Sequence, residues 1–127
     1  MRKAMLRSMM QVVVQRSDLA AALYQKAFNA KMTAACPQDD GTFMHAELDV
    51  YGQILALTEL PAGEEASPGN TMMFCLHFGK GKEALVQQAY DALKDGAQIH
   101  DPLGPCGFSS FMFGLIDRFG VNWCIFV

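Results

Sequence analysis

His45 and Glu47 are the first residues of this sequence whose types and spacing could support chemistry. They lie two positions apart in the alternating segment 43–51, so a strand would place both side chains on one face, about 7 Å apart. With His77 they form a set of two imidazoles and one carboxylate, which is a known metal-binding combination. A solvated strand face is the favoured interpretation of the pair, and the metal site is less favoured because His77 lies in a distant segment.

Cysteine is the other residue type that could react. The sequence has no Cys-x-x-Cys pair, which excludes a zinc finger and a thioredoxin-type motif. Cys124 could act as a nucleophile if a histidine or lysine stabilised its thiolate, but no such residue adjoins it in the sequence. We interpret the cysteines as reduced, small apolar residues. They are Cys36, Cys75, Cys106 and Cys124.

Composition limits the classes of function. Hydrophobic residues make up 51% of the 127 residues and charged residues 18%, so a single domain can fill its core and retain apolar side chains for a pocket or an interface. The net charge of −3 argues against nucleic-acid binding, although Arg2, Lys3 and Arg7 give the chain a basic start. The apolar run 9–14 is too short for a signal sequence or a membrane span, so we expect a cytoplasmic protein with no membrane partner.

The elements that must position these residues follow one order twice, strand, helix and three strands, on either side of a Pro- and Gly-rich linker at 61–70. We expect the first helix to start from an N-cap at Ser17 or Asp18 and to bury Leu19. We expect the second helix to bury Ala84 and Leu85, and the segment 102–107 to be a loop. The predicted strands are 9–15, 31–36, 43–51, 53–59, 71–78, 97–100, 109–116 and 121–127, and the predicted helices are 19–28 and 82–95.

Three segments carry a family resemblance. Residues 117–125 have the form D-x-F-G-V-x-W-x-I, residues 23–30 read LYQKAFNA, and residues 44–48 read MHAEL. In this order the chain resembles the PhnB-like branch of the vicinal oxygen chelate superfamily, which includes glyoxalase I, extradiol dioxygenases and fosfomycin and bleomycin resistance proteins. The resemblance implies an α+β fold in which modules 1–60 and 71–127 form one curved, mostly antiparallel sheet. The helices would lie on the convex side and a ligand cavity on the concave side.

The resemblance also implies where a metal would bind. The superfamily's ligand positions fall near Met9, at Thr58 or Glu59, near Met73 and at Cys124, and only Glu59 offers an ordinary hard donor. We therefore expect no tightly bound metal. The sequence also lacks a glycine-rich loop with an acidic residue about 20 positions later, so we expect no S-adenosylmethionine and no other cofactor.

The function expected from this resemblance is binding of a small molecule in an apolar cup by a homodimer. The alternative is a metal-dependent enzyme of glyoxalase or lyase type, with a rearranged metal site drawn from His45, Glu47, Glu59 and His77. Metal analysis would separate the two. The candidate ligand-binding residues are His45, Glu47, Glu59, Met73, His77 and Cys124.

Overall fold

The computed structural model describes residues 5–127, so Arg2 and Lys3 of the basic start lie outside the described residues. Two β-α-β-β-β modules follow one another along the chain, as the sequence predicts. The first consists of β1 (Met10–Val14), α1 (Ser17–Phe28), β2 (Lys31–Pro37), β3 (Phe43–Val50) and β4 (Gln53–Glu59). The second consists of β5 (Phe74–His77), α2 (Glu83–Leu93), β6 (Gln98–Gly104), β7 (Met112–Ile116) and β8 (Asn122–Phe126).

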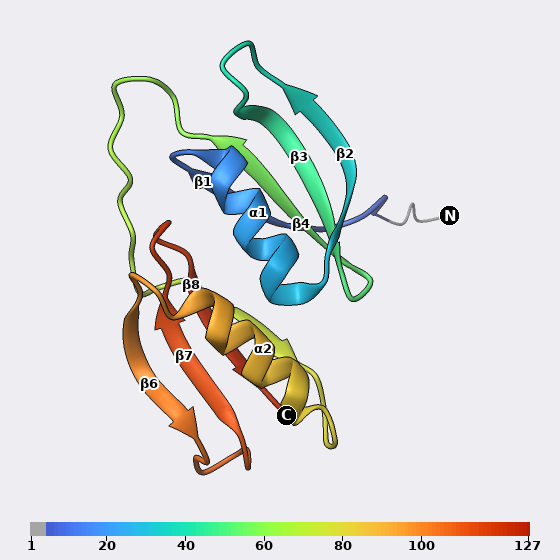
Figure 1. The fold of residues 1–127 in the computed structure, drawn as a ribbon, viewed down its shortest axis with the longest axis vertical. Helices are drawn as coiled ribbons and strands as arrows, with labels where there is room; N and C mark the ends of the chain where they lie inside the picture. The colour runs from blue at the N-terminus through green and yellow to red at the C-terminus, as the bar shows by residue number, and fades with distance from the viewer. Residues whose placement is uncertain (1–4) are drawn as a thin grey trace.

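The strands form two four-stranded sheets with the same internal order, β1-β4-β3-β2 and β5-β8-β7-β6. In each sheet the first and last strands of the module pair in parallel, and the other two pairs are antiparallel. The α+β class is confirmed, but the strands hydrogen-bond into two sheets and not into one continuous sheet. Figure 1 shows α1 and α2 on the same side of their sheets, as expected for the two modules.

One apolar core joins the two modules. The Trp123 ring on β8 is fully buried, and its centroid lies 5.6 Å from that of Tyr24 and 5.2 Å from that of Phe28, both on α1. The Gln88 side chain of α2 donates to Asn29 and to the Lys26 carbonyl at the end of α1. Aromatic rings thus bury a large apolar area between the modules, and polar contacts join the middle of α2 to the end of α1.

Several predicted details are wrong, for identifiable reasons. The helix α1 begins at Ser17 and is preceded by Arg16 in the left-handed conformation (φ 62°), with no cap from its own side chain. Leu19 is 46% exposed, and α2 buries Val86 instead of Ala84 or Leu85. These misses lie in the first turn of each helix, whereas the predicted inward residues Leu23, Phe28, Ala89 and Leu93 are buried.

Several strand boundaries also differ from the prediction, and β7 starts at Met112 instead of residue 109. The strand β5 starts only at Phe74, because the segment 71–73 has no partner strand. The strand β6 continues through Pro102 to Gly104, where the sequence indicates a loop. A proline is tolerated there because β6 is an edge strand and its pairing with β7 shifts register twice.

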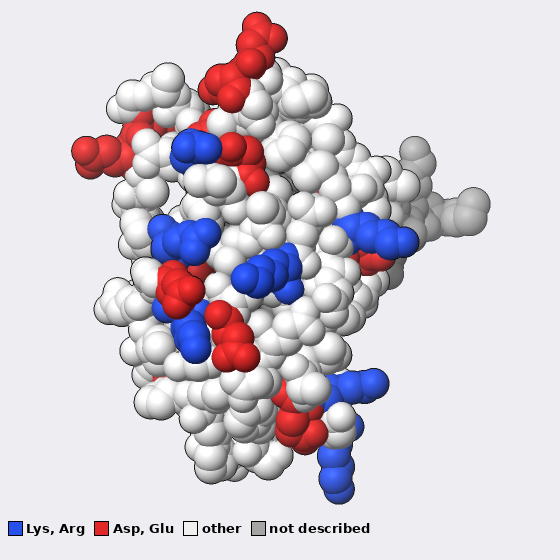
Figure 2. All heavy atoms as spheres, in the orientation of Figure 1, with Lys and Arg blue, Asp and Glu red and all other residues white. Residues whose placement is uncertain are grey.

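The surface carries both signs of charge. On the face drawn in Figure 2, Lys and Arg side chains lie among Asp and Glu side chains and do not gather into one basic patch. In residues 5–127, neither helix is long and apolar enough to span a membrane.

Candidate functional site

The face of each sheet that points away from its helix, called here the outer face, holds most of the candidate residues. On β3 the buried Leu48 faces the core, so the alternating residues His45 and Glu47 lie on the outer face. The structure brings these two into contact, with 2.8 Å between His45 Nε2 and Glu47 Oε2. It also adds a residue that spacing does not reveal, because Arg7 donates two hydrogen bonds to the same carboxylate, at 2.7 Å and 3.0 Å.

The ion pair with Arg7 determines the state of Glu47. Hydrogen bonds from Arg7 and then from His45 lower the pKa of the Glu47 carboxyl to about 2. The side chain of Glu47 is almost fully buried beside the more exposed Arg7. Glu47 is therefore ionised at neutral pH, with its charge matched by a bidentate guanidinium. This arrangement makes it a poor general base and leaves little of its charge for a cation.

The Glu59 side chain accepts hydrogen bonds at the start of α1. Its Oε1 accepts hydrogen bonds from the Ser17 backbone N–H (2.8 Å) and from Ser17 Oγ (2.7 Å), and its Oε2 accepts from the Arg16 N–H (3.0 Å). Glu59 thus reaches from β4 to accept the backbone N–H groups of the N-cap residue Arg16 and of the first helical residue Ser17, which have no acceptor within the helix. Neither oxygen of Glu59 is free of protein donors.

His77 and Cys124 lie in the second module, on the outer face of β5 and β8. The His77 ring stacks on Phe126, with centroids 4.5 Å apart. Burial, followed by the neighbouring Cys75 thiol, raises the pKa of Cys124 to about 11. Cys124 is therefore a protonated thiol at neutral pH, which is the opposite of an activated nucleophile.

A hydrogen-bonded cluster that sequence analysis missed lies beside Cys124. His100 on β6 contacts Asp101 Oδ2 through Nδ1 and Asn122 Oδ1 through Nε2, each at 2.8 Å. The imidazole reaches β8 by lying over Gly114 of β7, where a Cβ atom would come within 2.9 Å of His100 Nδ1. A glycine inside a strand is the signal that could have indicated this close approach.

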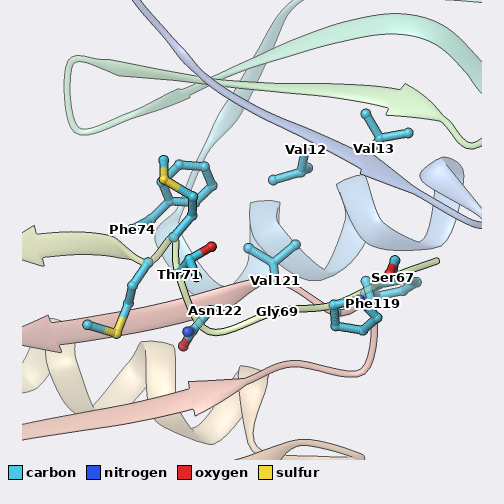
Figure 3. A pocket seen from close by; sticks show the side chains of 13 residues that line it. Val12, Val13, Ser67, Gly69, Thr71, Phe74, Phe119, Val121 and Asn122 are labelled. Atoms are coloured by element: carbon cyan, nitrogen blue, oxygen red, sulfur yellow. The ribbon is translucent and has the colours of Figure 1, made fainter.

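A cavity of about 320 Å³ that is open to solvent lies between β1 and the second module, and both apolar and polar side chains line it. Its walls come from Val12 and Val13 of β1, the chain segment leading to Phe74, and the turn before β8. In Figure 3 the side chains of Val12 and Val121 point toward one another across it. Of the six predicted ligand-binding residues, only Met73 lines this cavity.

The residues do not fit a metal of the kind that the superfamily binds. Within residues 5–127, no three His, Cys, Asp or Glu side chains converge on a common point suited to a metal ion. At the positions implied by the resemblance, Glu59 is occupied by backbone donors, Met73 offers a thioether, and Cys124 retains its proton. His45 and Glu47 belong to one module and His77 to the other.

Comparison with solved structures shows where this fold occurs. Protein PA1353 from Pseudomonas aeruginosa superposes with a TM-score of 0.79 at 21% identity, covering 96% of this chain and 97% of that chain. A putative 3-demethylubiquinone-9 3-methyltransferase, the PhnB protein from Bacillus cereus, gives 0.76 at 18% identity, with coverage of 94% and 98%. The fosfomycin resistance protein FosX from Listeria monocytogenes gives 0.70 at 13% identity, with coverage of 99% and 94%.

Sequence comparison supports the same grouping. No curated protein matches the chain significantly. The profile of the Glyoxalase/Bleomycin resistance protein/Dioxygenase superfamily matches residues 8–125, which is nearly the whole sequence. The chain belongs to the glyoxalase/bleomycin resistance protein/dioxygenase superfamily.

Proposed function

We propose that this protein binds a small, largely apolar molecule in the cavity between β1 and the second module. The observation that carries the proposal is the cavity itself, whose volume of about 320 Å³ lies at the lower end of the range of roughly 300–1,000 Å³ typical of ligand sites. A molecule of this size would contact both modules at once.

The cavity lining favours such a ligand. Val12, Val121 and Phe74 offer aliphatic and aromatic surface, and Met72 and Met73 offer flexible thioethers that adapt to different shapes. Ser67, Thr71 and Asn122 add polar groups that could orient the ligand. Apolar walls with few polar groups are typical of binding sites in which burial supplies affinity and hydrogen bonds supply orientation.

The proposal can be tested by filling the cavity with a larger side chain and measuring the loss of ligand binding. The probe is an anilinonaphthalene sulfonate dye, whose fluorescence rises in apolar sites, followed by competition with a library of small apolar fragments. Met73→Trp places an indole in the cavity from a partly exposed position, so the fold should tolerate it. We expect this variant to weaken dye and fragment binding at least tenfold, which corresponds to about 1.4 kcal/mol.

The matched control is Met44→Trp, since Met44 is an exposed methionine on β3 that does not line this cavity. Binding should remain within twofold of the unaltered protein in this variant. Equal affinities in the two variants, or no binding by any of the three proteins, would refute the assignment of the cavity.

A further inference from the structure

Two cysteines face each other across the parallel strands β5 and β8. Cys75 and Cys124 are direct register partners, flanked by the pairs Phe74–Trp123 and Leu76–Ile125. Because the flanking pairs pack into the core, alternation places both thiols on the outer face of the sheet. Neighbouring strands lie about 4.7–4.9 Å apart, and disulfides form between residues whose Cα atoms are roughly 4.4–6.8 Å apart.

The two thiols differ in accessibility, which suggests an order of reaction. Cys75 is exposed, whereas Cys124 is buried, and all four cysteines are free thiols. Since burial and the Cys75 thiol keep Cys124 protonated at neutral pH, a reagent from solvent meets Cys75 first. Cys124 is then held beside the atom that has reacted.

We propose that Cys75 and Cys124 form a reactive dithiol site that a peroxide converts to an intramolecular disulfide. Cys75 Sγ attacks one peroxide oxygen, the O–O bond breaks, and water and a sulfenic acid are formed. Water or a buffer base removes the Cys124 proton, and the resulting thiolate attacks the sulfenic sulfur. The S–S bond forms as hydroxide leaves, and the hydroxide takes up a proton to give a second water. Two thiols are oxidised and one hydrogen peroxide is reduced to two waters.

The disulfide would link the edge strand β5 covalently to β8. The strand β5 has four residues and, among residues 5–127, pairs only with β8, so few hydrogen bonds hold it in the sheet. The reaction uses no residue that lines the proposed ligand cavity, so it can succeed or fail independently of the ligand.

The experiment treats the full-length protein with hydrogen peroxide, blocks the remaining thiols under denaturing conditions, and maps the peptides by mass spectrometry. We expect the number of free thiols to fall from four to two, a Cys75–Cys124 peptide to appear, and dithiothreitol to restore all four thiols. In Cys124→Ser the disulfide should be lost, and dimedone should label the sulfenic acid at Cys75.

Two control variants make the assignment specific. Cys36→Ser changes an exposed thiol in the other sheet, and Cys106→Ser changes the exposed thiol of the β6–β7 connection. Both should still form the disulfide at the rate of the unaltered protein. A disulfide that joins Cys75 to Cys106, four thiols remaining after treatment, or dimedone labelling of Cys36 in place of Cys75 would overturn the proposal.

Discussion

Asp117 shows how one side chain can connect two modules. Its Oδ1 accepts the backbone N–H groups of Phe119 and Val121, and its Oδ2 accepts the Tyr24 hydroxyl at 2.6 Å and Trp123 Nε1 at 2.9 Å. The bond to the residue two positions later is the turn contact that the sequence predicts. The bond to Tyr24 reaches the first module, and burial beside this carboxylate raises the pKa of Tyr24 well above its usual value.

The first prediction follows from these four donors. Asp117→Asn replaces an acceptor oxygen with an NH₂ group that must face two donors, and the Trp123 N–H cannot reverse its role. We expect a loss of about 2–4 kcal/mol in the free energy of unfolding, measured in urea by Trp123 fluorescence. Tyr24→Phe, which removes one donor, should cost less, and Asp95→Asn in the exposed turn after α2 should cost almost nothing. An Asp117→Asn protein as stable as Asp95→Asn would contradict this view of the cluster.

The second prediction concerns Glu47 and pH. Its pKa in the folded protein is about 2, against an ordinary value of 4.5, so the folded state binds the proton less tightly than the unfolded state does. The resulting stabilisation is fully present above pH 4.5 and disappears as the pH falls toward 2. Between these values the melting temperature of the unaltered protein should fall more steeply than that of Glu47→Gln.

Glu65→Gln in the exposed linker is the control, and it should keep the steep pH dependence of the unaltered protein. If the melting temperatures of the unaltered protein and of Glu47→Gln changed equally with pH across this range, the ion pair between Arg7 and Glu47 would not form in solution.

At the scale of elements, the local sequence pattern predicted the order of helices and strands and some of their boundaries. The strand at 53–59 has the predicted bounds, and the repeated element order is correct. The features that the sequence did not predict are contacts between residues far apart in the chain. No local signal shows that Glu59 of β4 binds the start of α1 or that Arg7 reaches Glu47. Gly114 inside a strand indicates a close approach, but it does not show that His100 makes it. The sequence predicted which candidate side chains share a strand face. It did not predict which of them come into contact, because contacts depend on how distant strands pair.

The third prediction tests the role of Glu59 as the cap of α1. Glu59→Ala leaves the first N–H groups of the helix without their acceptor, so we expect about 1–2 kcal/mol of lost stability by urea unfolding. Glu64→Ala in the adjacent exposed segment should have little effect. If Glu59→Ala retained full stability but lost ligand binding, Glu59 would be a binding residue and the capping role would be secondary.

At the scale of the whole molecule, apolar side chains remain exposed. Met72 is 76% exposed, Phe108 65% and Met44 60%, and each sheet ends in an edge strand. Such surfaces and edges are commonly covered by a second copy of the chain. The fourth prediction is therefore a homodimer, with a light-scattering mass of twice 13.9 kDa at working concentration. A mass of 13.9 kDa, unchanged on concentration, would contradict it.

The fifth prediction concerns metal, because it separates the proposed binding protein from an enzyme that uses a rearranged metal site. The imidazoles and carboxylates named from the sequence are distributed over the two modules, and Glu47 and Glu59 are already bonded to protein donors. Affinity for a divalent ion rises with the number of charged ligands that reach it together. Protein purified without chelator should therefore carry well under one equivalent of nickel, zinc, manganese or iron, and EDTA should leave its melting temperature unchanged. One equivalent of metal, or a drop of several degrees with EDTA, would favour the enzyme, and substitution of His45 and then His77 by alanine would show which module holds the ion.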